Sequence, residues 1–230
     1  MSNKIHKTAF ISPNAVLGNN IEIGPYTIIA DNVNIGDNTQ IASHVVINGP
    51  TTLGVNNKIY QFSSIGEDPQ DLKYKGENVF LTIGDNNVIR EGCTINRGTK
   101  LGGGVTSIGN DNLFMAYVHI AHDCHIKNNV IIAVNVALAG HVIVEDFANL
   151  GGFVGVHQFC NIGCYSFAAA SSIITKDVLP YTKVSGYYAK VFGLNGICLQ
   201  RKNFSKQEIN LLKIAYKIVY RQNLSIDEAL

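Results

Sequence analysis

Apart from one phenylalanine, every sixth residue over three runs of this chain is aliphatic, and this spacing restricts its fold more than any other feature. The three runs contain 26 such positions, and only Phe114 and Ala168 among them are not Ile, Leu or Val. Two short interruptions separate the runs without changing the spacing within them. The runs extend from Ile5 to Ile65, from Ile83 to Ile95 and from Ile108 to Ile174.

A period of six matches neither an α-helix nor a simple amphipathic strand. It is typical of a triangular coil in which each side is one short strand and one turn, so that three hexads close one coil. Each aliphatic side chain then points to the axis above its equivalent in the previous coil, and stacked coils bury the stripe. The sequence therefore predicts a parallel β-helix over residues 1–180, with eight to nine coils and a length of roughly 40 Å. The alternative, an all-β sandwich with regular short strands, gives no reason for so strict a register.

The two interruptions, residues 66–82 and 101–107, are predicted to be loops that leave the β-helix at a corner. Such loops often carry function. The first contains charged residues, including Asp71, Lys73 and Lys75, and is a candidate ligand clamp. A solvated insertion is the alternative interpretation.

Residues 181–230 are predicted to form a linker and a short helical region. Ser205 and Glu208 have the spacing of a capping box, which starts a helix expected to run to about Gln222, with Asn223 as its C-cap. Ser225 and Glu228 repeat the start signal just before the chain ends. Residues 201–230 hold six Lys/Arg and three Asp/Glu, a net charge of +3 in a chain of net charge +1. This excess suits an acidic macromolecular partner, although an exposed helical face explains it equally well.

Composition excludes several classes of protein. Only 15% of the residues are charged, which argues against a nucleic-acid-binding protein with a broad basic face. No apolar run of about 18 residues is present, so no integral membrane segment is expected, and the N-terminus lacks the apolar core of a signal peptide. The five cysteines are odd in number and form no C-x-x-C pair, which favours reduced thiols in the cytoplasm.

Five of the seven histidines are clustered in one stretch of the repeat, and the three-hexad coil predicts which of them are neighbours. His122 aligns with Gly140 and Gln158, and Asp123 aligns with His141 and Phe159. An imidazole can act as a general base near neutral pH, and a carboxylate beside it can fix its tautomer. The amide of Gly140 can present an N–H to a developing oxyanion. Histidines that serve only at a surface or an interface are the alternative. The five clustered residues are His119, His122, His125, His141 and His157.

A metal site is the other chemistry that clustered histidines suggest, because three of them can bind catalytic zinc. Here two His-x2-His spacings on a six-residue period place neighbouring histidines on different parts of the coil cross-section. We therefore expect no bound metal.

Several segments together resemble one family. They are SHVVINGPTTLG, NKIYQFSSIGEDPQDLKYKGE, TINRGT, GGGVTSIGNDNLFM, HIAHDC, LAGHV, GGFVGVHQFC and FGLN, and they cover nearly the whole chain in order. They resemble the UDP-N-acetylglucosamine O-acyltransferases of lipid A biosynthesis, within the hexapeptide-repeat acyltransferases. The resemblance implies a left-handed β-helix, although the usual crossover rule favours the opposite hand. It also implies transfer of a 3-hydroxyacyl group from acyl carrier protein to the sugar 3-position of UDP-N-acetylglucosamine, which is the first step of that pathway. It further implies a homotrimer with its sites between subunits, and no cofactor beyond the phosphopantetheine that carries the donor.

The same resemblance implies residue roles. In HIAHDC, His122 is the general base, Asp123 its partner and His119 another residue of the site. In LAGH, Gly140 is the oxyanion donor and His141 lies at the substrate. The remaining substrate contacts implied by the resemblance are Gln70, Asp71 and Lys73 of QDLK, His157 and Gln158 of VHQF, and Asn195 and Arg201 at and after FGLN.

Three features depart from the family pattern. Ala170 stands where well-known members carry Gly at the floor of the acyl-chain groove, which predicts a donor no longer than those members accept. Ala170 lies 2.7 coils beyond His122, or roughly 13 Å along the axis, if both lie on one groove. Ile197 stands where some members have Glu, so one nucleotide contact is expected to be missing. The helical region is shorter than in the family, which predicts weaker carrier-protein docking or an incomplete chain.

Other functions stay open at this point. The later N-acyltransferase of the same pathway carries an extra domain before its β-helix, whereas here the repeat starts at Ile5. A sugar acetyltransferase that uses acetyl-CoA does not need the QDLK loop, and a non-catalytic scaffold needs no histidine cluster. Neither the acyl length nor the choice between an oxygen and an amine at the sugar 3-position follows from the sequence.

Overall fold

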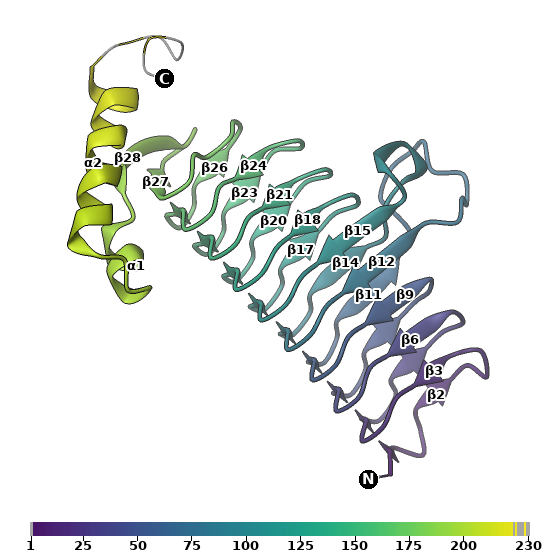
Figure 1. Cartoon of the computed structure of the whole chain (residues 1–230). Coiled ribbons are helices and arrows are strands. Elements are labelled where there is room, and N and C mark those ends of the chain that lie inside the picture. Colours follow the sequence, from purple (N-terminus) through teal and green to yellow (C-terminus); the bar gives the residue numbers. More distant parts are fainter. Residues whose placement is uncertain (1, 223, 225–227, 229–230) are drawn as a thin grey trace.

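Three β-sheets, parallel except for one C-terminal strand, wrap around one axis and form the body of the molecule (Figure 1). The computed structural model describes residues 2–222, 224 and 228. The first sheet contains β1 (Lys4–Ile5), β4 (Glu22–Ile23), β7 (Gln40–Ile41), β10 (Lys58–Ile59), β13 (Val88–Ile89), β16 (Leu113–Phe114), β19 (Ile131–Ile132), β22 (Asn149–Leu150), β25 (Phe167–Ala168), β27 (Thr182–Ser185) and β28 (Lys190–Leu194). The second contains β2 (Phe10–Ile11), β5 (Ile28–Ile29), β8 (Val46–Ile47), β11 (Ser64–Glu67), β14 (Thr94–Asn96), β17 (His119–Ile120), β20 (Ala137–Leu138), β23 (Gly155–Val156) and β26 (Ile173–Ile174). The third contains β3 (Val16–Leu17), β6 (Val33–Ile35), β9 (Thr51–Leu53), β12 (Phe80–Ile83), β15 (Val105–Ile108), β18 (His125–Ile126), β21 (Ile143–Val144) and β24 (Asn161–Ile162).

The six-residue period sets the register of these sheets. Strands that are three hexads apart in the sequence pair in parallel, as in Ile23 with Ile41 and Ile120 with Leu138. The aliphatic side chains therefore superimpose along the axis and are buried from Ile23 to Ile174. Ile5, with 43% of its surface exposed, belongs to the first coil, which is covered on one side only.

The corners between the sheets depend on left-handed backbone. The third residue after each aliphatic commonly has a positive φ, for example Asn32 at 59° and Asn38 at 58°. Asn tolerates this conformation better than most residues, which explains why the chain is rich in it. Asp123 at 60° and His141 at 63° occupy the same corner position. Both polar side chains therefore project from turns and not from the core.

Both excursions leave the β-helix at the corner between the second and third sheets and extend to the same side (Figure 1). The first joins β11 to β12 through residues 68–79, and the second joins β14 to β15 through residues 97–104. The second includes a 3₁₀ turn, η1 (Lys100–Gly102). These excursions are offset from the predicted loops at 66–82 and 101–107, because the strands on either side continue beyond the hexad. The pairing of β12 with β15 spans four residues, from Phe80 to Ile83.

The C-terminal region lies beside the last coils of the β-helix (Figure 1). β27 adds in parallel to β25, so the first sheet continues past residue 180, and β28 returns antiparallel to it. Two helices follow, α1 (Gly196–Arg201) and α2 (Lys206–Arg221). The predicted capping box is confirmed, since the Ser205 side chain accepts from the Glu208 N–H while the Glu208 carboxylate accepts from the Ser205 N–H.

The predicted end of α2 is confirmed to within a residue, because its C-cap is Gln222. Asn223 and the second predicted start signal at Ser225 lie outside the described residues. Neither α1 nor α2 has the combination of length and apolar character that would cross a bilayer.

Candidate active site

The register of the second sheet brings the candidate catalytic residues together. His122 and Asp123 follow β17 at the corner with the third sheet, and Gly140 and His141 follow β20 one coil later. Because His119 pairs with Ala137, residue 122 lies beside 140 and residue 123 beside 141. The backbone N–H of His141 donates to the carbonyl of His122 at 3.1 Å. The adjacency predicted from the three-hexad coil is confirmed.

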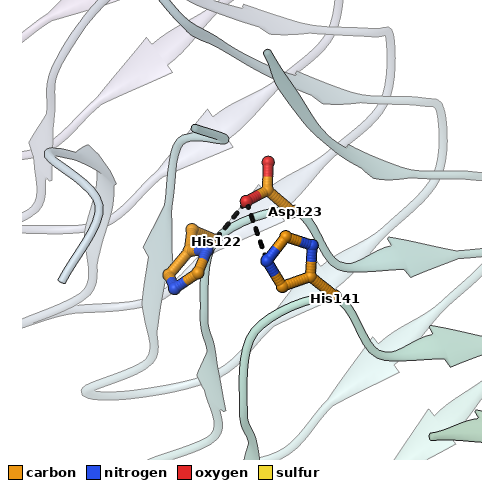
Figure 2. Close-up of side chains that lie close together, drawn as sticks. All are labelled: His122, Asp123 and His141. Carbon is orange, nitrogen blue, oxygen red and sulfur yellow. Dashed lines mark hydrogen bonds and ion pairs between the residues drawn. The ribbon is translucent and has the colours of Figure 1, made fainter. Parts of the chain in front are cut away.

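Asp123 lies between the two imidazoles (Figure 2). Its Oδ2 is 2.8 Å from Nδ1 of His122 and 3.6 Å from Nε2 of His141. An ionised carboxylate only accepts hydrogen bonds, so Nδ1 of His122 carries the hydrogen. The neutral ring therefore keeps its lone pair on Nε2, which is the arrangement a general base needs.

The Asp123 carboxylate is fully buried, and the 97–104 excursion supplies its other hydrogen bonds. The Thr99 N–H donates to Oδ1 and the Thr99 hydroxyl to Oδ2, both at 2.7 Å. The Asp123 backbone N–H donates to Oγ1 of Thr106 at 2.8 Å. A buried carboxylate without such partners would be costly, so these bonds keep it in place beside His122.

Gly140 is a glycine because the ring of His122 lies against it. A Cβ at this position would be 2.6 Å from Cε1 and 2.9 Å from Nε2 of His122. Gly140 is buried, and its N–H donates no hydrogen bond within the described part of the chain. It is therefore available to a negatively charged oxygen placed beside the base.

The ring of His141 is held on its far side by Phe159. The two rings stack with centroids 4.4 Å apart and an interplanar angle of 11°. His122 meets His141 edge to face, at 5.3 Å. The sequence aligned Phe159 with this column but assigned it no role, and its contact with His141 now indicates one in orienting that ring.

The remaining histidines differ in their surroundings. Nδ1 of His119 is 2.7 Å from Oγ1 of Thr94, and burial, with a smaller contribution from nearby His122, lowers the pKa of His119. His157 and Gln158 are exposed and lie one coil beyond Gly140. His125 lies on the third sheet, where its Nδ1 is 2.7 Å from Oγ of Ser107.

The residues of the QDLK segment lie on the 68–79 excursion. Gln70 and Lys73 are exposed, and the Asp71 carboxylate accepts from the Lys73 N–H at 2.9 Å. Asp71 and Lys73 line a small hollow together with Thr99 of the second excursion. The loop therefore borders the segment that holds Asp123.

Arg97 connects the two excursions. Its buried guanidinium pairs with the Asp68 carboxylate and donates to the carbonyls of Gly49 and Gly66, the latter at 2.7 Å. Sequence reasoning missed both Arg97 and Thr99. They stand in the TINRGT segment, but outside the periodic positions, and the hexad pattern carries no signal for them.

Asn195 and Arg201 lie elsewhere in the chain, in a cavity of about 460 Å³ between the C-terminal region and the first sheet. Lys183, Lys202 and Ile197 line the same cavity. None of the residues around the base, which we call the His122 cluster (His122, Asp123, Gly140 and His141), lines it. The Asn195 side chain donates to the Tyr165 carbonyl at 2.9 Å.

Ala170 is exposed at the corner that precedes β26, whereas His122 is at the corner that follows β17. The two residues therefore lie at opposite edges of the second sheet. A single groove that serves both must cross the outer face of that sheet.

The described residues contain one group that could share a metal ion. His122, Asp123 and His141 offer ligand atoms that all lie within 4.8 Å of one another. An ion bound there through Nδ1 of His122 would replace the hydrogen bond that fixes the tautomer of the base. The expectation that no metal is bound stays a prediction.

Comparison with known proteins places these features in a family. Residues 177–230 match the family model for domain 2 of UDP-N-acetylglucosamine O-acyltransferase, and residues 106–140 match the bacterial transferase hexapeptide model. A relative from Thermodesulfovibrio yellowstonii, named acyl-[acyl-carrier-protein]–UDP-N-acetylglucosamine O-acyltransferase, is 52% identical over 99% of this chain and 88% of its own length. A relative with the same name from a Janthinobacterium species is 49% identical over 98% of this chain and 86% of its own length.

Solved structures of related proteins agree with the sequence comparison. The UDP-N-acetylglucosamine O-acyltransferase of Moraxella catarrhalis superimposes with a TM-score of 0.97 at 50% identity, over 98% of this chain and 88% of that protein. A homologue from Acinetobacter baumannii superimposes with a TM-score of 0.96 at 48% identity, over 98% of this chain and 87% of that protein. The predicted left-handed parallel β-helix and the predicted family are both confirmed. The chain belongs to the UDP-N-acetylglucosamine O-acyltransferase family.

Proposed function

We propose that this chain transfers a 3-hydroxyacyl group from acyl carrier protein to the 3-hydroxyl of UDP-N-acetylglucosamine, the first step of lipid A biosynthesis, with His122 as general base. The observation that carries the proposal is the 2.8 Å contact of Asp123 with Nδ1 of His122, which leaves Nε2 free to accept a proton. The names of relatives about 50% identical over nearly the full length support the reaction.

Each step of the reaction has a candidate group. Nε2 of His122 takes the proton of the sugar hydroxyl as its oxygen attacks the thioester carbonyl. Asp123 stabilises the imidazolium that forms, and the Gly140 N–H donates to the tetrahedral oxyanion. When the intermediate collapses, the carbon–sulfur bond breaks and the imidazolium returns its proton to the departing phosphopantetheine thiolate. The products are the sugar ester and the free thiol, and no other cofactor or metal takes part.

The substrate contacts extend from this centre in our proposal. His119, His141, His157 and Gln158 surround the reacting groups along the second sheet and its corner. Gln70, Asp71 and Lys73 approach from the 68–79 excursion.

The cavity at Asn195 and Arg201 suits the nucleotide or the pantetheine phosphate, since Lys183 and Lys202 add positive charge there. Ile197 lines it where some members have an acidic residue.

We propose a homotrimer as the working unit. Within one protomer the Arg201 cavity and the His122 cluster share no lining residue, so a substrate that needs both is best served by two subunits. The basic C-terminal region, net +3 over residues 201–230, suits an acidic carrier protein. The cytoplasmic location stays a prediction from the cysteine pattern.

The reaction is tested by mass analysis of the product from UDP-N-acetylglucosamine and a panel of hydroxyacyl carrier proteins. Purified wild-type protein should form an ester with these donors and not with acetyl-CoA. His122→Ala should lose roughly 10²–10⁴-fold in kcat, the usual contribution of a general base. His125→Ala is the matched control, because its ring lies on the third sheet against Ser107, and it should keep wild-type activity. Activity of His122→Ala within severalfold of wild type would remove the base assignment. A product formed only with acetyl-CoA, or only with a 3-amino acceptor, would assign the chain to a different transferase.

A further inference from the structure

The Asp123 carboxylate receives more of its hydrogen bonds from Thr99 than from His122. Thr99 donates to both carboxylate oxygens at 2.7 Å, through its N–H to Oδ1 and through its hydroxyl to Oδ2. His122 contributes one bond, to Oδ2. Thr99 is only 5% exposed, so water does not readily replace these bonds.

The direction of the Thr99 hydroxyl is determined by its two neighbours. A hydroxyl has one hydrogen, and an ionised carboxylate can only accept, so that hydrogen is directed to Asp123. The Gly102 N–H donates to the same hydroxyl oxygen at 3.1 Å. The Thr99 hydroxyl therefore accepts a hydrogen bond from Gly102 and donates one to Asp123, and these two bonds fix its orientation.

The backbone of the 97–104 excursion is shaped to bring Thr99 this close. A Cβ at Gly102 would overlap the carboxyl group of Asp123, and a Cβ at Gly98 would overlap the backbone of Val105. The excursion thus packs on the carboxylate without an intervening side chain. Two backbone hydrogen bonds hold the end of the excursion in place. The Gly104 N–H donates to the Thr99 carbonyl and the Phe80 N–H donates to the Gly104 carbonyl, both at 2.8 Å.

We propose that Thr99 is a positioning residue for catalysis: it holds the Asp123 carboxylate oriented so that Nδ1 of His122 keeps its hydrogen and Nε2 faces the substrate. This inference rests on the proposed role of His122 as general base. Thr99 acts through the carboxylate, to which both of its donors are directed.

The loss of the hydroxyl has a defined geometric effect. Oδ2 of Asp123 accepts from both the Thr99 hydroxyl and Nδ1 of His122, and the Thr99 N–H holds Oδ1. Without the hydroxyl, one of the three bonds that fix the carboxylate is lost, and Oδ2 is less firmly held against His122. The expected defect is therefore in kcat and not in KM.

Thr99→Val is the test, because valine keeps the shape and the backbone N–H but removes the hydroxyl. We expect kcat to fall roughly 10- to 100-fold, the range for a buried hydrogen bond to a charged group, with KM within about twofold of wild type. Thr99→Ser keeps the hydroxyl and should restore kcat.

Thr27→Val is the matched control. Thr27 is also fully buried, and its hydroxyl donates at 2.7 Å to the Ala42 carbonyl in the N-terminal coils, so it should lose stability without losing kcat. Thermal unfolding of every variant separates a folding defect from a catalytic one.

The outcomes distinguish this inference from the proposed function. If His122→Ala is inactive while Thr99→Val keeps the wild-type kcat, the role of Thr99 is refuted and the base assignment stands. Equal losses in Thr99→Val and Thr99→Ser, tracking their unfolding temperatures, refute it as well. An active His122→Ala removes the base and this inference with it.

Gly102→Ala approaches the same contact from the other side and covers the case in which Thr99→Val does not fold. Its methyl group would displace the carboxylate or the loop, so kcat should fall, whereas wild-type kcat in a folded Gly102→Ala overturns the proposal.

Discussion

Replacing Gly140 with alanine would place a methyl group against the reactive side of His122. The ideal Cβ would be 2.6 Å from Cε1, 2.9 Å from Nε2 and 3.1 Å from Nδ1 of that ring. Gly140 has no positive φ, so the backbone tolerates alanine and the strain falls on the imidazole. The His122 side chain is 14% exposed and can relieve the contact by turning away from Gly140.

The expected fall in kcat of Gly140→Ala follows from these distances. Carbon atoms pack best about 3.5–4.0 Å apart, so the ring must move by about 1 Å. A misplacement of about 1 Å can cost about 10²-fold in rate, or about 2.7 kcal/mol of transition-state stabilisation. We expect kcat to fall about 10²-fold, and towards 10⁴-fold if the base is fully displaced. The free energy of unfolding should fall by at most about 2.5 kcal/mol, because overpacking costs about 1–3 kcal/mol and the reduced entropy of the unfolded chain offsets about 0.4–1 kcal/mol of it.

The assay is the initial rate of ester formation with one hydroxyacyl carrier protein, alongside thermal unfolding. Gly152→Ala is the matched control, since Gly152 has the same place in its hexad and its Cβ would be 3.3 Å from Cγ1 of Val134, far from any imidazole of the cluster. A Gly140→Ala enzyme within threefold of wild type, or one no worse than Gly152→Ala, would refute the close packing of the base on this glycine.

Four further predictions follow from the site. Arg97→Met removes the buried guanidinium that pairs with Asp68, so the 68–79 excursion should loosen and the KM for the nucleotide sugar should rise roughly tenfold, or about 1.4 kcal/mol, with a smaller change in kcat. Burial lowers the pKa of His119 from 6.5, so near and below that pH the unfolded chain binds more protons than the folded one. The stability of the protein should therefore fall as the pH drops below that value. His119→Gln should flatten the fall in Tm between about pH 7 and pH 5. Ala170→Gly should shift the preferred donor to a longer acyl chain, read by product mass, and an unchanged preference would exclude Ala170 as a length determinant. Treatment with a chelator should leave kcat unchanged, and an enzyme that loses activity and regains it with zinc would contradict the metal-free mechanism.

The six-residue period by itself determined the β-helical architecture and the centre of the candidate site, whereas the left hand of the helix was expected from the family resemblance. Inward aliphatics such as Ile120 and Leu138 can be buried only if coils of three hexads superimpose, and that stacking sets His122 beside Gly140 and Asp123 beside His141. Because the repeat is periodic, the spatial neighbour of a residue follows from its position in the sequence. The tautomer of His122 could also be inferred, since a carboxylate beside an imidazole can only accept.

Contacts made by the non-periodic segments were decided by the tertiary structure alone. Thr99 reaches Asp123 and Arg97 reaches Asp68 because both excursions leave at one corner, and no spacing in the sequence relates a loop residue to its partner. The same limit applies to Arg201, which lines a cavity that His122 does not share, between the C-terminal region and the first sheet. A repeat carries its geometry in its period, whereas a loop takes its geometry from the surfaces on which it packs.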